Sequence, residues 1–285
     1  MITFTTEDLD FMKQRGSDPE QVRRQLECFE KGFDFAHLDR AATVDDGIIR
    51  LSKDEIEELV ADYPNMLSGK KVVKFVPASG AASRMFKELF SYLSDDSPEI
   101  EAKALAFLDK LPDFPFYDEL REVMAQDGYS MESEMKNRNY KLIVRYLLLP
   151  DGLDYGNNPK GLLLFHHYED KIRTAVEEHL VEAALYVQNE GQCHIHFTVS
   201  PQHQLGFESL LENVLPQYEK RYGVTYHIDF SIQNPATDTV AAELDNSPFR
   251  DGNGNLLFRP AGHGALIHNL NNIDADVVFV KTGKL

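Results

Sequence analysis

Residues 74–87, KFVPASGAASRMFK, hold the side chains and backbone groups best suited to bind an anion. The apolar run at residues 72–76 predicts a buried strand, and a helical pattern resumes at about Arg84. Between them lie small residues whose amides can point at phosphate oxygens, where the dipole of the following helix favours negative charge. Arg84 can add a bidentate phosphate contact. The sequence therefore predicts a phosphate-binding loop, with an ordinary strand-to-helix turn as the alternative.

This loop is neither a P-loop nor a dinucleotide-binding turn, because it lacks both glycine patterns that define them. It resembles the phosphate loop of sugar nucleotidyltransferases, which is usually written Ala-Gly-Gly-x-Gly-Thr-Arg-Leu/Met. Two glycines of that pattern are replaced here, by Ser79 and Ala82. The resemblance implies a catalytic role for Arg84. It implies nucleotide contacts from Ser79, Gly80, Ala81, Ala82, Ser83 and Lys87.

A second string, Asn158-Pro159-Lys160-Gly161, is similar to the Pro-Lys-Gly element of UDP-sugar pyrophosphorylases. In those enzymes the element follows the phosphate loop closely, whereas here a long helical stretch separates the two. The resemblance implies that Lys160 places a compact positive charge beside the phosphate under attack. A lysine at a turn before a strand is the alternative.

The third string consists of Phe230-Ser231-Ile232-Gln233 and a glycine-rich segment at residues 258–266. It resembles the elements with which the same superfamily surrounds the base and sugar, which implies nucleotide contacts from Gln233, Gly262, His263 and Gly264. A Gln amide can pair with a base edge through a donor and an acceptor together. A connecting loop without a binding role is the alternative. Ligands of open α/β sheets bind at the carboxyl ends of strands, so the three strings are expected to face one crevice.

Strands and helices alternate in the second half of the chain, which predicts an α/β fold with a mainly parallel sheet flanked by helices. The resemblance makes this fold similar to the Rossmann-like nucleotide-diphospho-sugar transferases. We expect an N-terminal helical extension at residues 1–68 and an α/β domain at 69–285, with a helical insertion at about 94–157. In the extension Thr6 and Ser17 are predicted helix caps, and residues 52–55 resemble a capping box. The insertion is expected to include a helical segment at 132–148, and further strands are expected at 194–199, 224–232 and 277–280. A long amphipathic helix is predicted at residues 171–189, with Glu177 and Glu178 facing solvent.

Composition and net charge limit the kinds of partner that the protein is expected to bind. The 285 residues are 42% hydrophobic and 27% charged, with a formal net charge of -18, which disfavours binding to nucleic acid because phosphate backbones are repelled. No membrane span and no signal peptide are expected, and only Cys28 and Cys193 are present, so a reducing cytoplasm is the expected compartment.

Including Thr174-Ala175-x-Glu177-Glu178-His179-Leu180, the chain as a whole is similar to an uncharacterised bacterial family with a nucleotidyltransferase-like fold. The resemblance implies a protein that joins a nucleoside triphosphate to a sugar phosphate and releases pyrophosphate with the help of Mg²⁺. In the pyrophosphorylases an acidic element that binds the metal follows a strand such as residues 277–280. Here Lys281 follows instead and the chain stops, so a truncated or divergent form is expected.

Other readings stay open at this point. One is a non-catalytic nucleotide-binding or regulatory protein on the same scaffold, and another is a fragment whose exposed edge makes it oligomerise. His194 and His196 point to one face of a strand, but no further ligand at a zinc-like spacing joins them, so no metal site within the protein is expected. The base, the sugar and the oligomeric state are not determined by the sequence.

Overall fold

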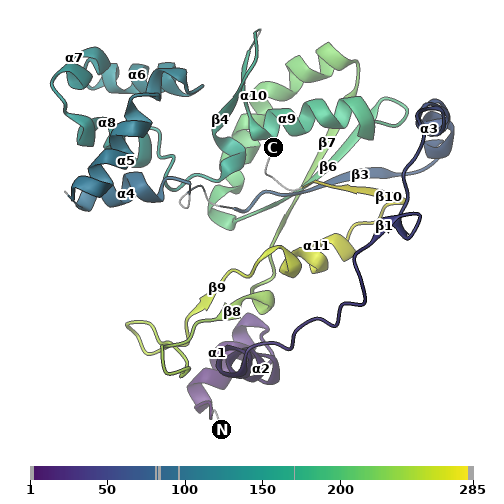
Figure 1. Ribbon diagram of the computed structural model, residues 1–285, viewed down its shortest axis with the longest axis horizontal. Coiled ribbons are helices and arrows are strands. Elements are labelled where there is room, and N and C mark those ends of the chain that lie inside the picture. Colours follow the sequence, from purple (N-terminus) through teal and green to yellow (C-terminus); the bar gives the residue numbers. More distant parts are fainter. Residues whose placement is uncertain (1–2, 81, 83–84, 96, 170, 282–285) are drawn as a thin grey trace. The chain divides into compact units, whose positions relative to one another are not determined.

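The computed structural model describes residues 3–80, 82, 85–95, 97–169 and 171–281 (Figure 1). The chain forms two compact units, each assembled from two segments of the sequence. Unit 1 comprises Met1–Lys71 and Ile232–Ala275, and unit 2 comprises Val72–Ser231 and Asp276–Leu285. In the described part of the chain, no helix is long and apolar enough to cross a membrane.

Unit 1 begins with helices whose starts are set by capping side chains. Thr5 caps α1 (Thr6–Arg15), Asp18 caps α2 (Pro19–Lys31), and Ser52 with Glu55 forms the predicted capping box of α3 (Lys53–Leu67). The first two caps lie one residue from the predicted ones, Thr6 and Ser17. The other elements of this unit are β1 (Thr43–Val44), β2 (Gly47–Ile48), β8 (Thr239–Val240), β9 (Phe258–Arg259), the 3₁₀ helix η6 (His263–Leu266) and α11 (Ile267–Asn271).

The core of unit 1 joins its two segments. Met12, Val22 and Leu26 from the first segment pack with Val240 and Leu256 from the second, and all five are buried. Two ion pairs link the same segments: Arg15 to Asp238 at 2.6 Å and Arg250 to Asp8 at 2.7 Å. Residues distant in sequence therefore share one core in this unit.

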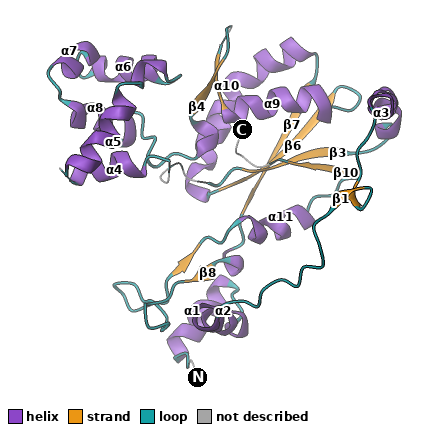
Figure 2. Cartoon of the chain, in the orientation of Figure 1, coloured by secondary structure: helices purple, strands orange, loops and turns teal. Residues whose placement is uncertain are grey.

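Unit 2 contains a four-stranded parallel sheet, visible in Figure 2. The strand order is β10 (Val277–Val280), β3 (Val72–Pro77), β6 (Gln192–Val199) and β7 (Thr225–Ile232). Central strand β3 pairs in parallel with both neighbours, Val73 opposite Val278 on one side and opposite His194 on the other. The predicted α/β class with a parallel sheet is confirmed.

Helices α9 (Ala175–Glu182) and α10 (Gln204–Tyr222) and the π-helix η3 (Ala183–Val187) pack on one face of this sheet. A hairpin of β4 (Leu164–His167) and β5 (Ile172–Thr174) precedes α9. The predicted amphipathic helix at 171–189 is wrong in two respects. Residues 172–174 form strand β5 instead of the first turn of a helix. Residues 175–181 of α9 are all buried, so this part of the helix has no face toward solvent.

The predicted solvent exposure of Glu177 and Glu178 is corrected by the same helix. Their exposed fractions are 4% and 8%. Both carboxylates are buried because the hairpin strand supplies their counter-ions: Lys171 lies 2.6 Å from Glu177, and Arg173 lies 3.0 Å from Glu178. Buried charges are retained where they are paired in this way.

Between β3 and β4 the chain forms a group of helices with its own apolar core, which includes Phe116, Leu120, Met124, Ile143 and Leu147. A single predicted segment at 132–148 is broken in two, because Arg138 takes a left-handed backbone conformation with φ of 57°. The helices are α4 (Lys87–Ser94), α5 (Pro98–Leu108), α6 (Tyr117–Gln126), α7 (Met131–Lys136) and α8 (Tyr140–Leu148).

Candidate functional site

The loop that follows β3 lies at the carboxyl ends of two neighbouring parallel strands. The Ala78 amide donates to the carbonyl of Thr198, the penultimate residue of β6, at 2.8 Å. The hydroxyl of Ser200, just after β6, donates to the Ser79 carbonyl at 3.3 Å. These contacts hold the start of the loop at the edge where ligands of parallel α/β sheets bind.

The structure brings Lys160 to this loop although the helical insert separates them in sequence. The Lys160 amide donates to the Gly80 carbonyl at 3.2 Å, and the Ala82 amide donates to the Asn158 carbonyl at 3.2 Å. Lys160 is half-buried, and no described carboxylate lies within ion-pair distance of its ammonium group. A lysine without a counter-ion beside a loop of small residues is suited to an anionic ligand.

The predicted anion loop differs from expectation in two ways. The amides of Ala78 and Ala82 are used within the protein, so they are not available to phosphate oxygens. The helix after the loop begins only at Lys87, preceded by a turn in which the Met85 amide donates to the Ala82 carbonyl. Ser79 is half-buried, and Gly80 and Lys87 are exposed. Ala81, Ser83 and Arg84 lie outside the described residues.

The third predicted string is divided between the units: Phe230 and Ser231 belong to unit 2, as do the loop and Lys160, whereas Gln233 and residues 258–266 belong to unit 1. Within unit 1 the Gln233 amide nitrogen donates to Asp238 at 3.1 Å. Gly262 caps the 3₁₀ helix η6, which contains Gly264 and the backbone of His263; the His263 side chain is outside the described part. One crevice shared by all three strings therefore remains a prediction, while the first two strings lie side by side.

The sequence analysis did not predict a group of polar and charged side chains on the face of the sheet that α9 and η3 cover. We call this group the Glu182 cluster; it consists of Lys74, Glu182, Lys281, His179 and Tyr186. Glu182 accepts from the Lys74 ammonium at 2.6 Å and from the Tyr186 hydroxyl at 3.1 Å, both through Oε2. Its Oε1 lies 3.0 Å from the ammonium nitrogen of Lys281. Lys74 is fully buried in β3 and also donates to the His179 carbonyl at 3.1 Å.

The environment of the Glu182 cluster shifts three pKa values. Burial lowers the pKa of Lys74 to about 8, although the charge of Glu182 opposes the shift. Burial alone would raise the pKa of Glu182, but hydrogen bonds and the charge of Lys74 outweigh it and lower the pKa to about 2. Burial, assisted by the positive charge of Lys74, lowers the pKa of His179 to about 3, so its imidazole is neutral near pH 7.

A single signal in the sequence could have located this cluster. Lys74 interrupts an otherwise apolar run from Val72 to Val76, and a lysine in a central strand needs a buried carboxylate partner. The alternation of strand residues also places Lys74 and Phe279 on the same face, since they are paired in register. The identity of the partner, Glu182, could not be read from spacing because it lies on another element.

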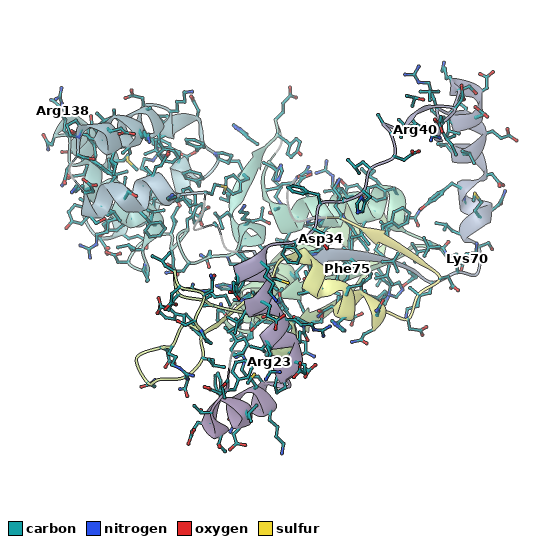
Figure 3. The ribbon with its side chains drawn as sticks, turned by 60° about the horizontal axis from the view of Figure 1, so that its bottom comes forward. Arg23, Asp34, Arg40, Lys70, Phe75 and Arg138 are labelled. Carbon is teal, nitrogen blue, oxygen red and sulfur yellow. The ribbon has the colours of Figure 1, made fainter. Side chains whose placement is uncertain are left out.

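The strand order has a topological switch point between β3 and β10. From β3 the chain adds β6 and then β7 on one side, and β10 is added on the other side. Ligands of open α/β sheets bind outside the carboxyl ends of the strands at such a point. Lys281, the residue after β10, extends the pairing there, because its amide donates to the Phe75 carbonyl at 3.0 Å (Phe75 is labelled in Figure 3).

The histidines of β6 and β7 are engaged with each other and with polar neighbours. The rings of His194 and His227 stack with centroids 4.5 Å apart, and His196 Nε2 lies 2.7 Å from the Ser231 hydroxyl. Among the residues whose placement is described, no three His, Cys, Asp or Glu side chains gather as metal ligands.

The described residues at the carboxyl ends of β3 and β10 do not fit Mg²⁺. This ion takes carboxylate oxygens, usually one or two, together with the phosphates of the substrate. The carboxylate of the cluster, Glu182, uses both oxygens for lysine ammonium groups, and Lys281 occupies the position after β10. An ammonium group at that position repels a divalent cation.

Comparison with known proteins assigns the chain to a family without assigning a reaction. The sequence model of a domain of unknown function (DUF4301) matches residues 5–282, almost the whole chain. No curated protein and no solved structure matches the chain. Because this match covers far more than half of the sequence, the chain belongs to the DUF4301 domain family.

Proposed function

We propose that this chain binds the phosphates of a nucleoside triphosphate or a nucleotide sugar at the loop after β3, on a fold similar to that of sugar nucleotidyltransferases. The observation that carries the proposal is the hydrogen bond between the Lys160 amide and the Gly80 carbonyl, 3.2 Å long. It joins two strings that lie far apart in the sequence and that the same resemblance assigns to one phosphate site. Nothing in their local sequences required them to meet.

Two further features support the proposal. The loop lies at the carboxyl end of β3, beside the topological switch point of the strand order, where open α/β sheets bind ligands. Lys160 is half-buried with no described carboxylate as a partner, so an anion that displaces its water also neutralises its charge. The Ser79 and Gly80 amides, which no described group of the protein engages, complete the set of donors on the described loop.

If the protein is catalytic, the reaction is a nucleotidyl transfer. An oxygen of a sugar phosphate attacks the α-phosphorus in line, the bond from this phosphorus to its bridging oxygen breaks, and pyrophosphate leaves with that electron pair. Lys160 would stabilise the charge on the α-phosphate, and Arg84 that on the leaving group. Gln233 and the glycine-rich segment around His263 would hold the nucleoside.

A second candidate is nucleotide binding without turnover. It is favoured by the engagement of the Ala78 and Ala82 amides, which leaves fewer donors for a transition state that accumulates negative charge. This candidate predicts affinity for a nucleotide but no release of pyrophosphate.

The experiment is calorimetric titration of the native chain with a panel of nucleoside triphosphates and nucleotide sugars, with and without Mg²⁺. Lys160→Gln is expected to weaken binding about tenfold or more, because a hydrogen bond to a charged group contributes about 1.5–3 kcal/mol. Arg84→Ala tests the second cation. Lys220→Gln is the matched control. It removes the same charge from an exposed lysine in the last turn of α10, which leads to the amino end of β7.

The outcomes separate the candidates. Binding that Lys160→Gln weakens and Lys220→Gln does not establishes the phosphate site, and a pyrophosphate-release assay then decides between transfer and binding alone. A folded native chain that binds no member of the panel overturns the proposal.

A further inference from the structure

The Glu182 cluster holds more positive than negative charge. Lys74 and Lys281 share the single carboxylate of Glu182, one on each oxygen, and His179 is neutral near pH 7. Tyr186 adds a hydroxyl donor and no charge. In a chain whose net charge is -18, this leaves a local surplus of one positive charge.

The surplus charge reaches solvent through Lys281. Lys74 is completely buried, whereas the side chain of Lys281 is 41% exposed. An ammonium group has three donors, so the contact with Glu182 leaves two for another ligand. Glu182 fixes the direction of Lys281, and Lys74 in turn neutralises Glu182, so the carboxylate does not repel an anion that approaches Lys281.

The backbone of Lys281 lies near the start of the proposed phosphate loop. Its amide continues the β10–β3 pairing by donating to the Phe75 carbonyl, which places its backbone next to Val76. The loop begins two residues farther on, at Ala78. Lys281 therefore approaches the carboxyl end of β3 from the side of β10, while Ser200 marks the opposite flank, beside β6.

We propose that Lys281 forms a second phosphate subsite, so that the site takes a ligand with two or more linked phosphate groups rather than a single phosphate. This inference rests on the proposed function and adds a residue to its site. One phosphate lies at Gly80 and Lys160, and a neighbouring phosphate of the same chain lies at Lys281.

The test uses inorganic tripolyphosphate and orthophosphate as probes, titrated calorimetrically into the full chain in EDTA. Lys281→Gln is expected to weaken tripolyphosphate binding about tenfold and to leave orthophosphate binding unchanged, because only the longer anion reaches both subsites. Lys281→Arg keeps the charge and should retain most of the affinity. Lys160→Gln should weaken both probes, and Lys220→Gln neither.

The ratio of the two affinities is a readout that general loss of structure does not produce. Thermal unfolding of each variant confirms that it is folded, and Glu182 keeps Lys74 as its partner when Lys281 is changed. Tripolyphosphate binding that depends on Lys160 but not on Lys281 overturns this inference and leaves the proposed function intact. Absence of binding by both the probes and the nucleotide panel overturns both.

Discussion

Lys74 shows how one residue can determine the interior of the sheet. It stands in the middle of β3, fully buried, with its ammonium group 2.6 Å from Glu182. Removal of such a charge from water is costly, and a pair of this kind is stable only while both partners remain. Loss of Glu182 leaves Lys74 without this carboxylate, whereas loss of Lys74 leaves Glu182 paired with Lys281, so the first change is expected to have the larger effect on stability.

We predict that Glu182→Gln destabilises the protein by about 3–5 kcal/mol, because it leaves the buried Lys74 ammonium without a counter-ion. Lys74→Met, which is close in volume and uncharged, should lower the free energy of unfolding by less, because Glu182 keeps Lys281 as its partner. Urea unfolding of both variants measures the difference. Equal destabilisation by the two substitutions would contradict this account of the Glu182 cluster.

Glu182→Gln should also change how the free energy of unfolding depends on pH. The pKa of Glu182 is lowered in the folded state to about 2, so the folded state releases this proton more readily than the unfolded chain. The stabilisation is complete above the ordinary pKa of the carboxyl group, 4.5, and is lost as the pH falls toward about 2. Native protein should therefore lose stability more steeply than Glu182→Gln over this interval.

At the scale of elements, the positions of α8 and of the segment after it decide whether Lys160 reaches the loop. The turn after α8 is tight: the Leu153 amide donates to the Tyr146 carbonyl at 2.7 Å. Gly152 lies in this turn, and a Cβ atom built there would overlap the Tyr146 carbonyl. The chain then continues through Asn158, which is bound to Ala82, to Lys160.

Gly152→Ala is expected to destabilise unit 2 by about 1–3 kcal/mol, since backbone atoms must move to admit the methyl group. It should also weaken phosphate binding, because the shift is transmitted to the segment that carries Lys160. Thermal unfolding and tripolyphosphate titration measure the two effects. Gly252→Ala is the control, because a Cβ atom there meets open space; equal effects at both glycines would refute the steric explanation.

At the scale of the whole molecule, each unit is built from two stretches of sequence. The core of unit 1 combines Leu26 and its neighbours with Val240 and Leu256, whereas the phosphate loop, Lys160 and the Glu182 cluster all belong to unit 2. Damage to the core of unit 1 and damage to the proposed phosphate site should therefore be separable.

Leu26→Ala, at a fully buried position, should destabilise unit 1 by about 2–5 kcal/mol through the cavity that it creates. Tripolyphosphate affinity should be unchanged, because every residue assigned to its binding lies in unit 2. Calorimetric unfolding and titration of the variant provide the two measurements. A parallel loss of affinity would show that the site depends on unit 1.

The sequence predicted the four strands of the parallel sheet: β3 and β10 are largely apolar runs, and β6 and β7 alternate apolar with polar residues. It placed the capping box of α3 correctly, since Ser52 and Glu55 interact locally. It failed at α9, where the pattern resembled a surface helix. Burial of Glu177 and Glu178 depends on Lys171 and Arg173, whose approach is a matter of tertiary packing.

The sequence by itself determined the α/β class, the small-residue loop after β3 and the net charge, because these follow from local pattern and composition. Only the tertiary structure decided that Lys160 lies against Gly80, that Glu182 is shared by Lys74 and Lys281, and that residues 232–275 pack with the N-terminal segment. Each of these contacts joins residues far apart in the chain. Local periodicity carries no information about such pairs, because loop closure and the packing of whole elements select them.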